Sequence, residues 1–148
     1  MHSIVSLISG RGSNLEAIVK TAAAKSWDVQ FTGVISNNPE AKGLEFARSQ
    51  GISTQVVNHR DFASREAFDQ ALMNEIDRLG ADLIVLAGFM RILTPAFIKH
   101  YEGRMINIHP SLLPLYPGLH THQRALDGGD QQHGATVHFV SAEVDQGS

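Results

Sequence analysis

Short apolar runs alternate along this chain with stretches in which apolar residues recur at helical spacing. The first run, residues 4–8, is rich in β-branched side chains, as are strands that are buried on both faces. It leads into Gly10 and Gly12, after which Leu15 and Ile18 follow at the spacing of one helix face. The pattern therefore predicts a strand, a glycine turn and a helix.

The same alternation continues along the chain. Further strands are expected at residues 31–36, 54–57, 83–87, 105–109 and 135–140. Further helices are expected at residues 41–49, from Arg65 onward, after Pro95 and around residues 123–126. Strands that alternate with helices imply parallel βαβ units, because each crossover helix returns the chain to the same end of the sheet. We therefore expect an α/β, Rossmann-like fold, which is an open, mainly parallel sheet with helices on both faces.

The proline-rich residues 110–118 interrupt this pattern and predict an ordered loop, because proline cannot donate to a strand ladder or a helix interior. No repeat or linker divides the chain, so residues 1–148 are expected to form a single domain. At 148 residues and 43% hydrophobic content the chain is long enough to bury one core.

Composition excludes several classes of function. The absence of cysteine excludes disulfides, thiolate zinc sites and cysteine nucleophiles. A formal charge of −3 with dispersed Lys and Arg makes nucleic acid an unexpected partner. No apolar run has the length of a bilayer span, and the first residues do not have the pattern of a signal peptide. We expect a cytoplasmic protein that binds neither nucleic acid nor membrane.

Ligands of open α/β sheets gather at the carboxyl ends of the strands, and the glycine turn at residues 10–14 follows the first one. Backbone N–H groups at a helix start can hold an anion, and this turn lacks the P-loop lysine and the third dinucleotide glycine. A phosphate monoester therefore fits better than NAD. In the alternative interpretation the glycines only make the turn, and Ser13 with Glu16 forms a capping box.

Asn107 and His109 share one face at the end of another expected strand, because side chains alternate along a strand. Asparagine can donate to a developing oxyanion and histidine can transfer a proton, a combination suited to acyl transfer. The alternative is a structural pair that the proline-rich loop satisfies. The segment after residues 83–87 combines Met90 and Arg91, which are able to line a pocket for a flat heterocycle with an anionic tail. The alternative there is core packing of Phe89 and Ile92.

Two further constellations are weaker. Histidines at positions 120, 122, 133 and 138 suggest a metal, but no carboxylate stands at ligand spacing, so no metal is expected. A hydrolase triad of Ser111, His109 and Asp145 lacks the G-x-S-x-G elbow and is disfavoured.

Several segments together resemble the phosphoribosylglycinamide formyltransferase family, the folate-dependent glycinamide ribonucleotide transformylases. They are residues 8–15, 86–93, 107–114, 116–122 and 134–140. The resemblance runs from Ile4 to Gly147 and implies the formyltransferase fold. It also implies transfer of a formyl group from 10-formyltetrahydrofolate to the amine of 5-phosphoribosylglycinamide in purine biosynthesis. It implies in addition that the protein needs no metal, that its partners are small molecules only, and that it is a monomer or homodimer.

The resemblance further implies roles for individual residues. The implied catalytic residues are Asn107, His109 and Asp145, and the implied substrate phosphate site is Gly12, Ser13 and Asn14. The implied folate-binding residues are Arg65, Met90, Arg91, Ile92, Leu93, Asn107, Ser141, Ala142, Glu143, Val144 and Asp145. In this mechanism Asn107 and protonated His109 stabilise the formyl oxygen as it becomes negative, and Asp145 supports the imidazolium and helps to move the amine proton.

Alternatives remain a formyltetrahydrofolate deformylase, a methionyl-tRNA formyltransferase and a non-catalytic phosphometabolite-binding module. One departure from the family stands at the end of the sequence. The family's Asp-x-Gly motif runs on into further strands and helices, whereas here Asp145 is followed by three residues only. We expect a catalytic domain whose C-terminal part is missing relative to the family, with weak or absent activity and reduced stability, because the sheet keeps an unpaired edge.

Overall fold

The computed structural model describes residues 1–110 and 135–139, with backbone alone for residues 109–110 and 135–139. Its strands are β1 (His2–Ile8), β2 (Val29–Ser36), β3 (Thr54–Val56), β4 (Leu83–Ala87), β5 (Met105–Pro110) and β6 (Ala135–Phe139). Its α-helices are α1 (Ser13–Ala24), α2 (Lys42–Ser49), α3 (Arg65–Leu79) and α4 (Pro95–His100), and a 3₁₀ helix, η1, covers His59–Asp61.

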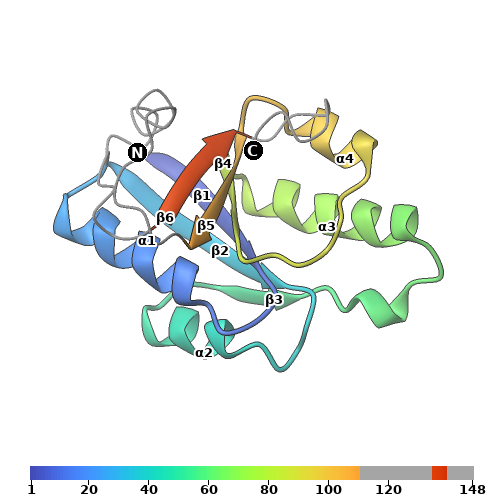
Figure 1. Ribbon diagram of the computed structural model, residues 1–148, viewed down its shortest axis with the longest axis horizontal. Helices are drawn as coiled ribbons and strands as arrows, with labels where there is room; N and C mark the ends of the chain where they lie inside the picture. Colours follow the sequence, from blue (N-terminus) through green and yellow to red (C-terminus); the bar gives the residue numbers. More distant parts are fainter. Residues whose placement is uncertain (111–134, 140–148) are drawn as a thin grey trace.

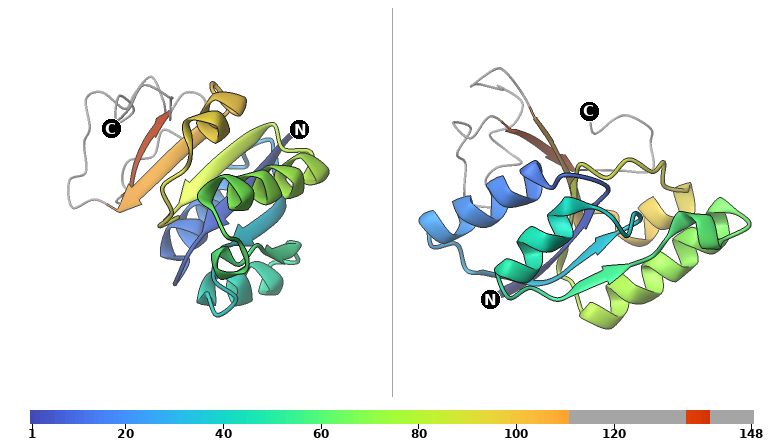
Figure 2. Two further views of the ribbon diagram at one scale, coloured as in Figure 1. Left: turned by 90° about the vertical axis from the view of Figure 1, so that its right-hand side faces the viewer. Right: turned by 90° about the horizontal axis from the view of Figure 1, so that it is seen from below.

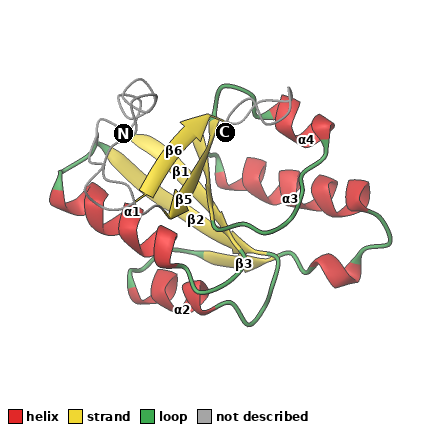
Figure 3. Cartoon of the chain, in the orientation of Figure 1, coloured by secondary structure: helices red, strands yellow, loops and turns green. Residues whose placement is uncertain are grey.

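The described strands form one sheet of six in the order β3-β2-β1-β4-β5-β6 (Figure 1; Figure 3). Neighbours from β3 to β5 pair in parallel, and β6 pairs with β5 in the antiparallel direction. The expected open, mainly parallel sheet is therefore confirmed.

Helices cover both faces of this sheet, with α1 and α2 on one side and α3 and α4 on the other (Figure 2). Alternate side chains of each central strand supply the two cores, as the period of two along a strand requires. In β1, Ile4 and Ile8 pack under α1 and α2, whereas Val5 and Leu7 pack under α3 and α4. All four side chains are fully buried. This is why residues 4–8 read as a continuous apolar run.

Local signals explain where the longer helices begin and end. The Ser64 side chain accepts a hydrogen bond from the Ala67 N–H and caps α3, which ends at Leu79 and is followed by Gly80 with a left-handed φ of 69°. Thr94 caps α4 in the same way, and Pro95 follows as its first residue, where no backbone donor is needed.

The boundaries differ from the expectation in a few places. Strand β1 begins earlier, at His2, where it pairs with Val29 of β2. Pro110, expected in the loop, is the last residue of β5 and pairs with Ala135. Helix η1 was not expected from the sequence, because three residues are too few to show a periodic pattern. Its cap is the Asn58 side chain, which accepts a hydrogen bond from the Arg60 N–H. The helix expected around residues 123–126 lies outside the described residues.

Candidate functional site

Side-chain hydrogen bonds join the segments after β1 and β4 and the end of β5 at the carboxyl edge of the sheet. The Asn14 side-chain amide donates to the carbonyl of Ile108 in β5 at 3.2 Å. The Met90 N–H donates to the hydroxyl of Ser9, which follows β1, at 2.7 Å. The glycine turn, the segment after β4 and the end of β5 therefore form one contiguous site, although residues 9 and 108 are far apart in the sequence.

The glycine turn opens α1 without a side-chain cap. Gly12 is the N-cap residue with a left-handed φ of 82°, and the helix begins at Ser13. The expected capping box of Ser13 and Glu16 is wrong, because Ser13 already lies inside the helix and the Glu16 carboxylate pairs with Lys20 at 2.8 Å. No described side chain caps the first turn, so its N–H groups keep the capacity to hold an anion.

The backbone of this turn lies against α2. A Cβ on Gly12 would stand 2.5 Å from the Cα of Gly43, and the Gly43 N–H donates to the carbonyl of Gly10 at 3.1 Å. Gly12 is therefore required both by its conformation and by this close approach.

Asn107 lies in β5 and is partly buried, while its neighbours Ile106 and Ile108 are buried in the core under α1 and α2. The expected alternation along this strand is thus confirmed for Asn107. The strand register places Asn107 opposite His138 and His109 opposite Thr136. For His109 and His138 the structure describes only the backbone.

The segment after β4 turns at Gly88 and then exposes large apolar side chains. Met90 is 80% exposed and Ile92 is 72% exposed, whereas Leu93 is buried. The core alternative is therefore wrong for Ile92. Phe89 is partly buried and packs against the core under α3 and α4, as that alternative predicted.

A polar network beneath this segment was not anticipated from the sequence. The Ser9 hydroxyl donates to Asn37 Oδ1 at 2.6 Å, and Asn37 Nδ2 lies 3.3 Å from His59 Nδ1. Both Ser9 and Asn37 are at least nine-tenths buried. Their positions directly after β1 and β2 were the only signal that the sequence offered.

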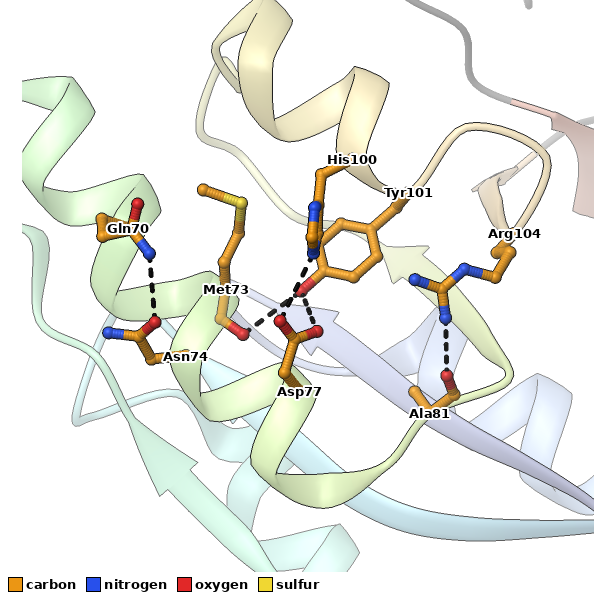
Figure 4. Close-up of polar contacts among 8 residues, drawn as sticks. All are labelled: Gln70, Met73, Asn74, Asp77, Ala81, His100, Tyr101 and Arg104. Carbon is orange, nitrogen blue, oxygen red and sulfur yellow. Dashed lines mark hydrogen bonds and ion pairs between the residues drawn. The ribbon is translucent and has the colours of Figure 1, made fainter.

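Polar contacts join α3 to the end of α4 and to the residues that follow it (Figure 4). The fully buried Tyr101 donates its hydroxyl to Asp77 Oδ1 at 2.8 Å, and His100 Nε2 lies 3.3 Å from the other Asp77 oxygen. Arg104 stacks its guanidinium over the Tyr101 ring at 5.2 Å. Burial and the Asp77 carboxylate raise the pKa of Tyr101 well above the usual tyrosine range.

One hollow of about 440 Å³ lies at the opposite end of α1, and it is lined by Trp27, Phe31 and Ile52 among others. None of the residues that the sequence suggested for chemistry lines it. Among the described residues no cluster of metal-ligating side chains occurs, and no helix has the length and apolarity to cross a bilayer.

The remaining expected residues are placed only in part. Arg65 is exposed as the first residue of α3. Residues 111–134 and 140–148 lie outside the described part of the chain, and they include the expected folate-binding residues 141–145 with Asp145.

Comparison with known proteins decides between the classes that this site allows. Residues 2–148 match the family described as formyl transferase. The chain belongs to the formyl transferase family. Membership implies a formyl donor of the folate type and small-molecule substrates.

Individual members of the formyl transferase family are similar over nearly the whole chain. Phosphoribosylglycinamide formyltransferase of Escherichia coli K12 is 54% identical over 145 residues, which are 98% of this chain and 68% of that protein. The trifunctional purine biosynthetic protein adenosine-3 of Drosophila melanogaster is 47% identical over 144 residues, 96% of this chain but 11% of that protein. The solved phosphoribosylglycinamide formyltransferase of Coxiella burnetii has a TM-score of 0.76 at 50% identity and covers 97% of this chain and 67% of its own.

Proposed function

We propose that this formyl transferase moves the formyl group of 10-formyltetrahydrofolate to the amine of 5-phosphoribosylglycinamide, a step of purine biosynthesis. The observation that carries the proposal is the 54% identity, over 145 residues, to an enzyme of that name. The hydrogen bond from Asn14 to Ile108 supports it, because it joins an anion-binding helix start to the end of β5, the strand that carries Asn107. We further propose a cytoplasmic, single-domain protein, a monomer or homodimer, that requires no metal.

The substrate phosphate binds at Gly12, Ser13 and Asn14 in this proposal. The uncapped first turn of α1 supports it, because backbone N–H groups there are directed toward an anion. The side-chain amide of Asn14 is already bonded to the Ile108 carbonyl. We therefore assign the backbone of Asn14 to the phosphate and its side chain to holding the end of β5.

The formyl donor binds along Met90, Arg91, Ile92 and Leu93, together with Arg65, Asn107 and residues 141–145. Exposure of Met90 and Ile92 supports this assignment, because apolar side chains at 80% and 72% exposure favour covering by a flat heterocycle. Leu93 is buried, so its contribution to the donor comes from the backbone.

The chemistry follows from the charge that develops during transfer. The amine nitrogen attacks the formyl carbon, so a new C–N bond forms while the formyl oxygen becomes negative. Asn107 and protonated His109 stabilise that oxygen, and Asp145 stabilises the imidazolium. The bond from the formyl carbon to the folate nitrogen then breaks, and the amine proton moves to that nitrogen through water with the help of Asp145.

Replacement of Asn107 or His109 by alanine tests these roles. Each loss of an oxyanion donor is expected to lower the rate of formyl transfer by about two to three orders of magnitude. The measurement is appearance of tetrahydrofolate with purified chain, and binding of 5-phosphoribosylglycinamide by calorimetry serves as the control for folding. Near-parental transfer rates in both variants would rule out the assignment.

The same assay separates this function from its alternatives when the amine substrate is left out. A transferase releases tetrahydrofolate only when 5-phosphoribosylglycinamide is present. Equal release without it would establish a deformylase, and binding of 5-phosphoribosylglycinamide without any binding of the folate donor would establish a phosphometabolite-binding module.

A further inference from the structure

The backbone of residues 90–94 is held at both ends by side chains from other elements. At one end the Met90 N–H donates to Ser9 Oγ at 2.7 Å. At the other end the Thr94 N–H donates to Asp69 Oδ2, also at 2.7 Å. Ser9 follows β1 and Asp69 lies in α3, so the two acceptors come from different elements. Ser9 is 9% exposed and Asp69 is 1% exposed, and the hydrogen bond to Asp69 is buried whereas the one to Ser9 is partly buried.

Ser9 is itself oriented by the network beneath the segment. Its single hydroxyl proton goes to Asn37 Oδ1 at 2.6 Å, so the oxygen lone pairs remain for the Met90 N–H. Asn37 in turn contacts His59 through Nδ2 and through its backbone carbonyl, at 3.3 and 3.2 Å from Nδ1. The position of the Met90 amide is thus tied to the ends of both β1 and β2.

Asp69 is difficult to explain by packing alone. Its second carboxylate oxygen, Oδ1, is buried and has no hydrogen-bond partner among the described residues. A buried oxygen without a partner costs stability, so a carboxylate is a poor choice for a position that only fills the core. The hydrogen bond that Asp69 accepts from the Thr94 N–H is the contact that explains a carboxylate at this buried position.

Between the two anchors Met90 and Ile92 face outward, whereas Leu93 is buried. Met90 and Ile92 are the exposed apolar side chains of the segment, and Arg91 lies with its guanidinium over the Phe68 ring at 5.3 Å. Phe68 is fully buried beside Asp69 in α3. Buried groups therefore fix the backbone of residues 90–94, while the exposed side chains of Met90 and Ile92 remain accessible to a ligand.

We propose that Ser9 and Asp69 are positioning residues that hold residues 90–94 in the shape that receives the formyl donor. This inference rests on the proposed function, which assigns Met90 to Leu93 to the donor. A segment that is already ordered loses less conformational entropy when a ligand binds, and this raises affinity without a direct contact. Neither side chain is assigned a part in the chemistry.

The test replaces each anchor by alanine and measures binding to a stable deaza analogue of 10-formyltetrahydrofolate. Each variant loses one hydrogen bond to the segment, so the affinity for the analogue is expected to fall about five- to tenfold in Ser9→Ala and in Asp69→Ala. Exchange of the Met90 amide with solvent accelerates in the first variant and exchange of the Thr94 amide in the second. Affinity for 5-phosphoribosylglycinamide changes by less than about twofold in Asp69→Ala, because the phosphate turn is untouched.

Conservative variants separate positioning from general damage. Asp69→Asn keeps a carbonyl oxygen for the Thr94 N–H and is expected to bind the analogue as the parent does. Thr32→Val is the matched control, because it removes a hydroxyl bonded to the Ile4 carbonyl at 3.3 Å, away from the segment. It lowers stability without changing affinity for the analogue. If Asp69→Ala does not fold, the test relies on Ser9→Ala, through its affinity for the analogue and the exchange rate of its Met90 amide.

Two results would overturn the inference, and they differ in what else they affect. Parental affinity for the analogue in both alanine variants would refute the positioning role and leave the proposed function intact. Absence of analogue binding by the parent chain would refute the proposed donor site, and the positioning role with it.

Discussion

Gly12 shows how one residue can serve both the fold and the site. Its positive φ turns the chain from β1 into α1, and its missing side chain lets the backbone lie against Gly43. The sequence suggested the turn, because glycine tolerates this conformation. Contact with α2 was not predictable, since the two glycines are brought together only when both helices pack on the same face of the sheet.

Gly12→Ala is expected to destabilise the chain by more than about 1 kcal/mol, because alanine is strained at a φ of 82° and its Cβ would collide with Gly43. Gly51→Ala is the matched control, since Gly51 has a φ of 75° but a Cβ at that position would meet nothing within 4 Å. Urea unfolding compares the two. Equal losses of stability would show that the close approach to Gly43 has no energetic effect.

At the scale of elements, α3 and α4 illustrate what periodicity can and cannot predict. The apolar positions of α3 and a helix after Pro95 were predicted from the sequence, and the structure confirms both. The contact between the helices was not predicted, because it depends on Tyr101, which follows α4, reaching Asp77 on α3 (Figure 4). A tyrosine hydroxyl must find a partner when it is buried, and only the packed helices determine which one.

Tyr101 predicts a specific response to alkaline pH. Its pKa is raised on folding, so the folded state keeps the phenol proton at pH values where the unfolded chain, with a pKa of about 10, loses it. The stability that Tyr101 contributes is therefore complete below pH of about 10 and falls as the pH rises further. Tyr101→Phe, which cannot ionise, is expected to be less stable at pH 7 by about 1 kcal/mol because it loses the hydrogen bond to Asp77.

The measurement is the free energy of unfolding of both proteins as a function of pH. The difference in the free energy of unfolding between the parent and Tyr101→Phe should shrink above a pH of about 10. Only the parent loses stability there, because its unfolded chain ionises Tyr101 while the folded state keeps the proton. A difference that stays constant from neutral to strongly alkaline pH would contradict the buried, neutral phenol.

At the scale of the whole molecule, β1 is shared by both cores. Ile4 packs on the side of α1 and α2 and Leu7 on the side of α3 and α4, and both side chains are fully buried. Two cores on one strand cannot separate without breaking the sheet. This arrangement supports the proposal that the chain is a single domain.

Ile4→Ala and Leu7→Ala test that proposal together. Each is expected to lower the free energy of unfolding by about 2–5 kcal/mol, because a cavity is left in a packed core. Trp27 is the single tryptophan of the chain and packs against the core that contains Ile4, so its fluorescence reports on that side of the sheet. In each variant the unfolding midpoint measured by Trp27 fluorescence should shift by the same amount as the midpoint measured by far-UV circular dichroism. Separate transitions by the two probes in the Leu7 variant would indicate two independent units.

The sequence by itself determined the alternation of strands and helices over residues 1–110, the glycine turn and the position of Asn107 between buried neighbours in β5. These features depend on local spacing, which a periodic pattern records directly. Tertiary structure decided that Ile92 faces outward, that Asn14 bonds to the end of β5, and that Ser9 and Asp69 anchor residues 90–94. Those contacts join residues from different elements, and their partners are set by how strands and helices pack, which no local pattern contains.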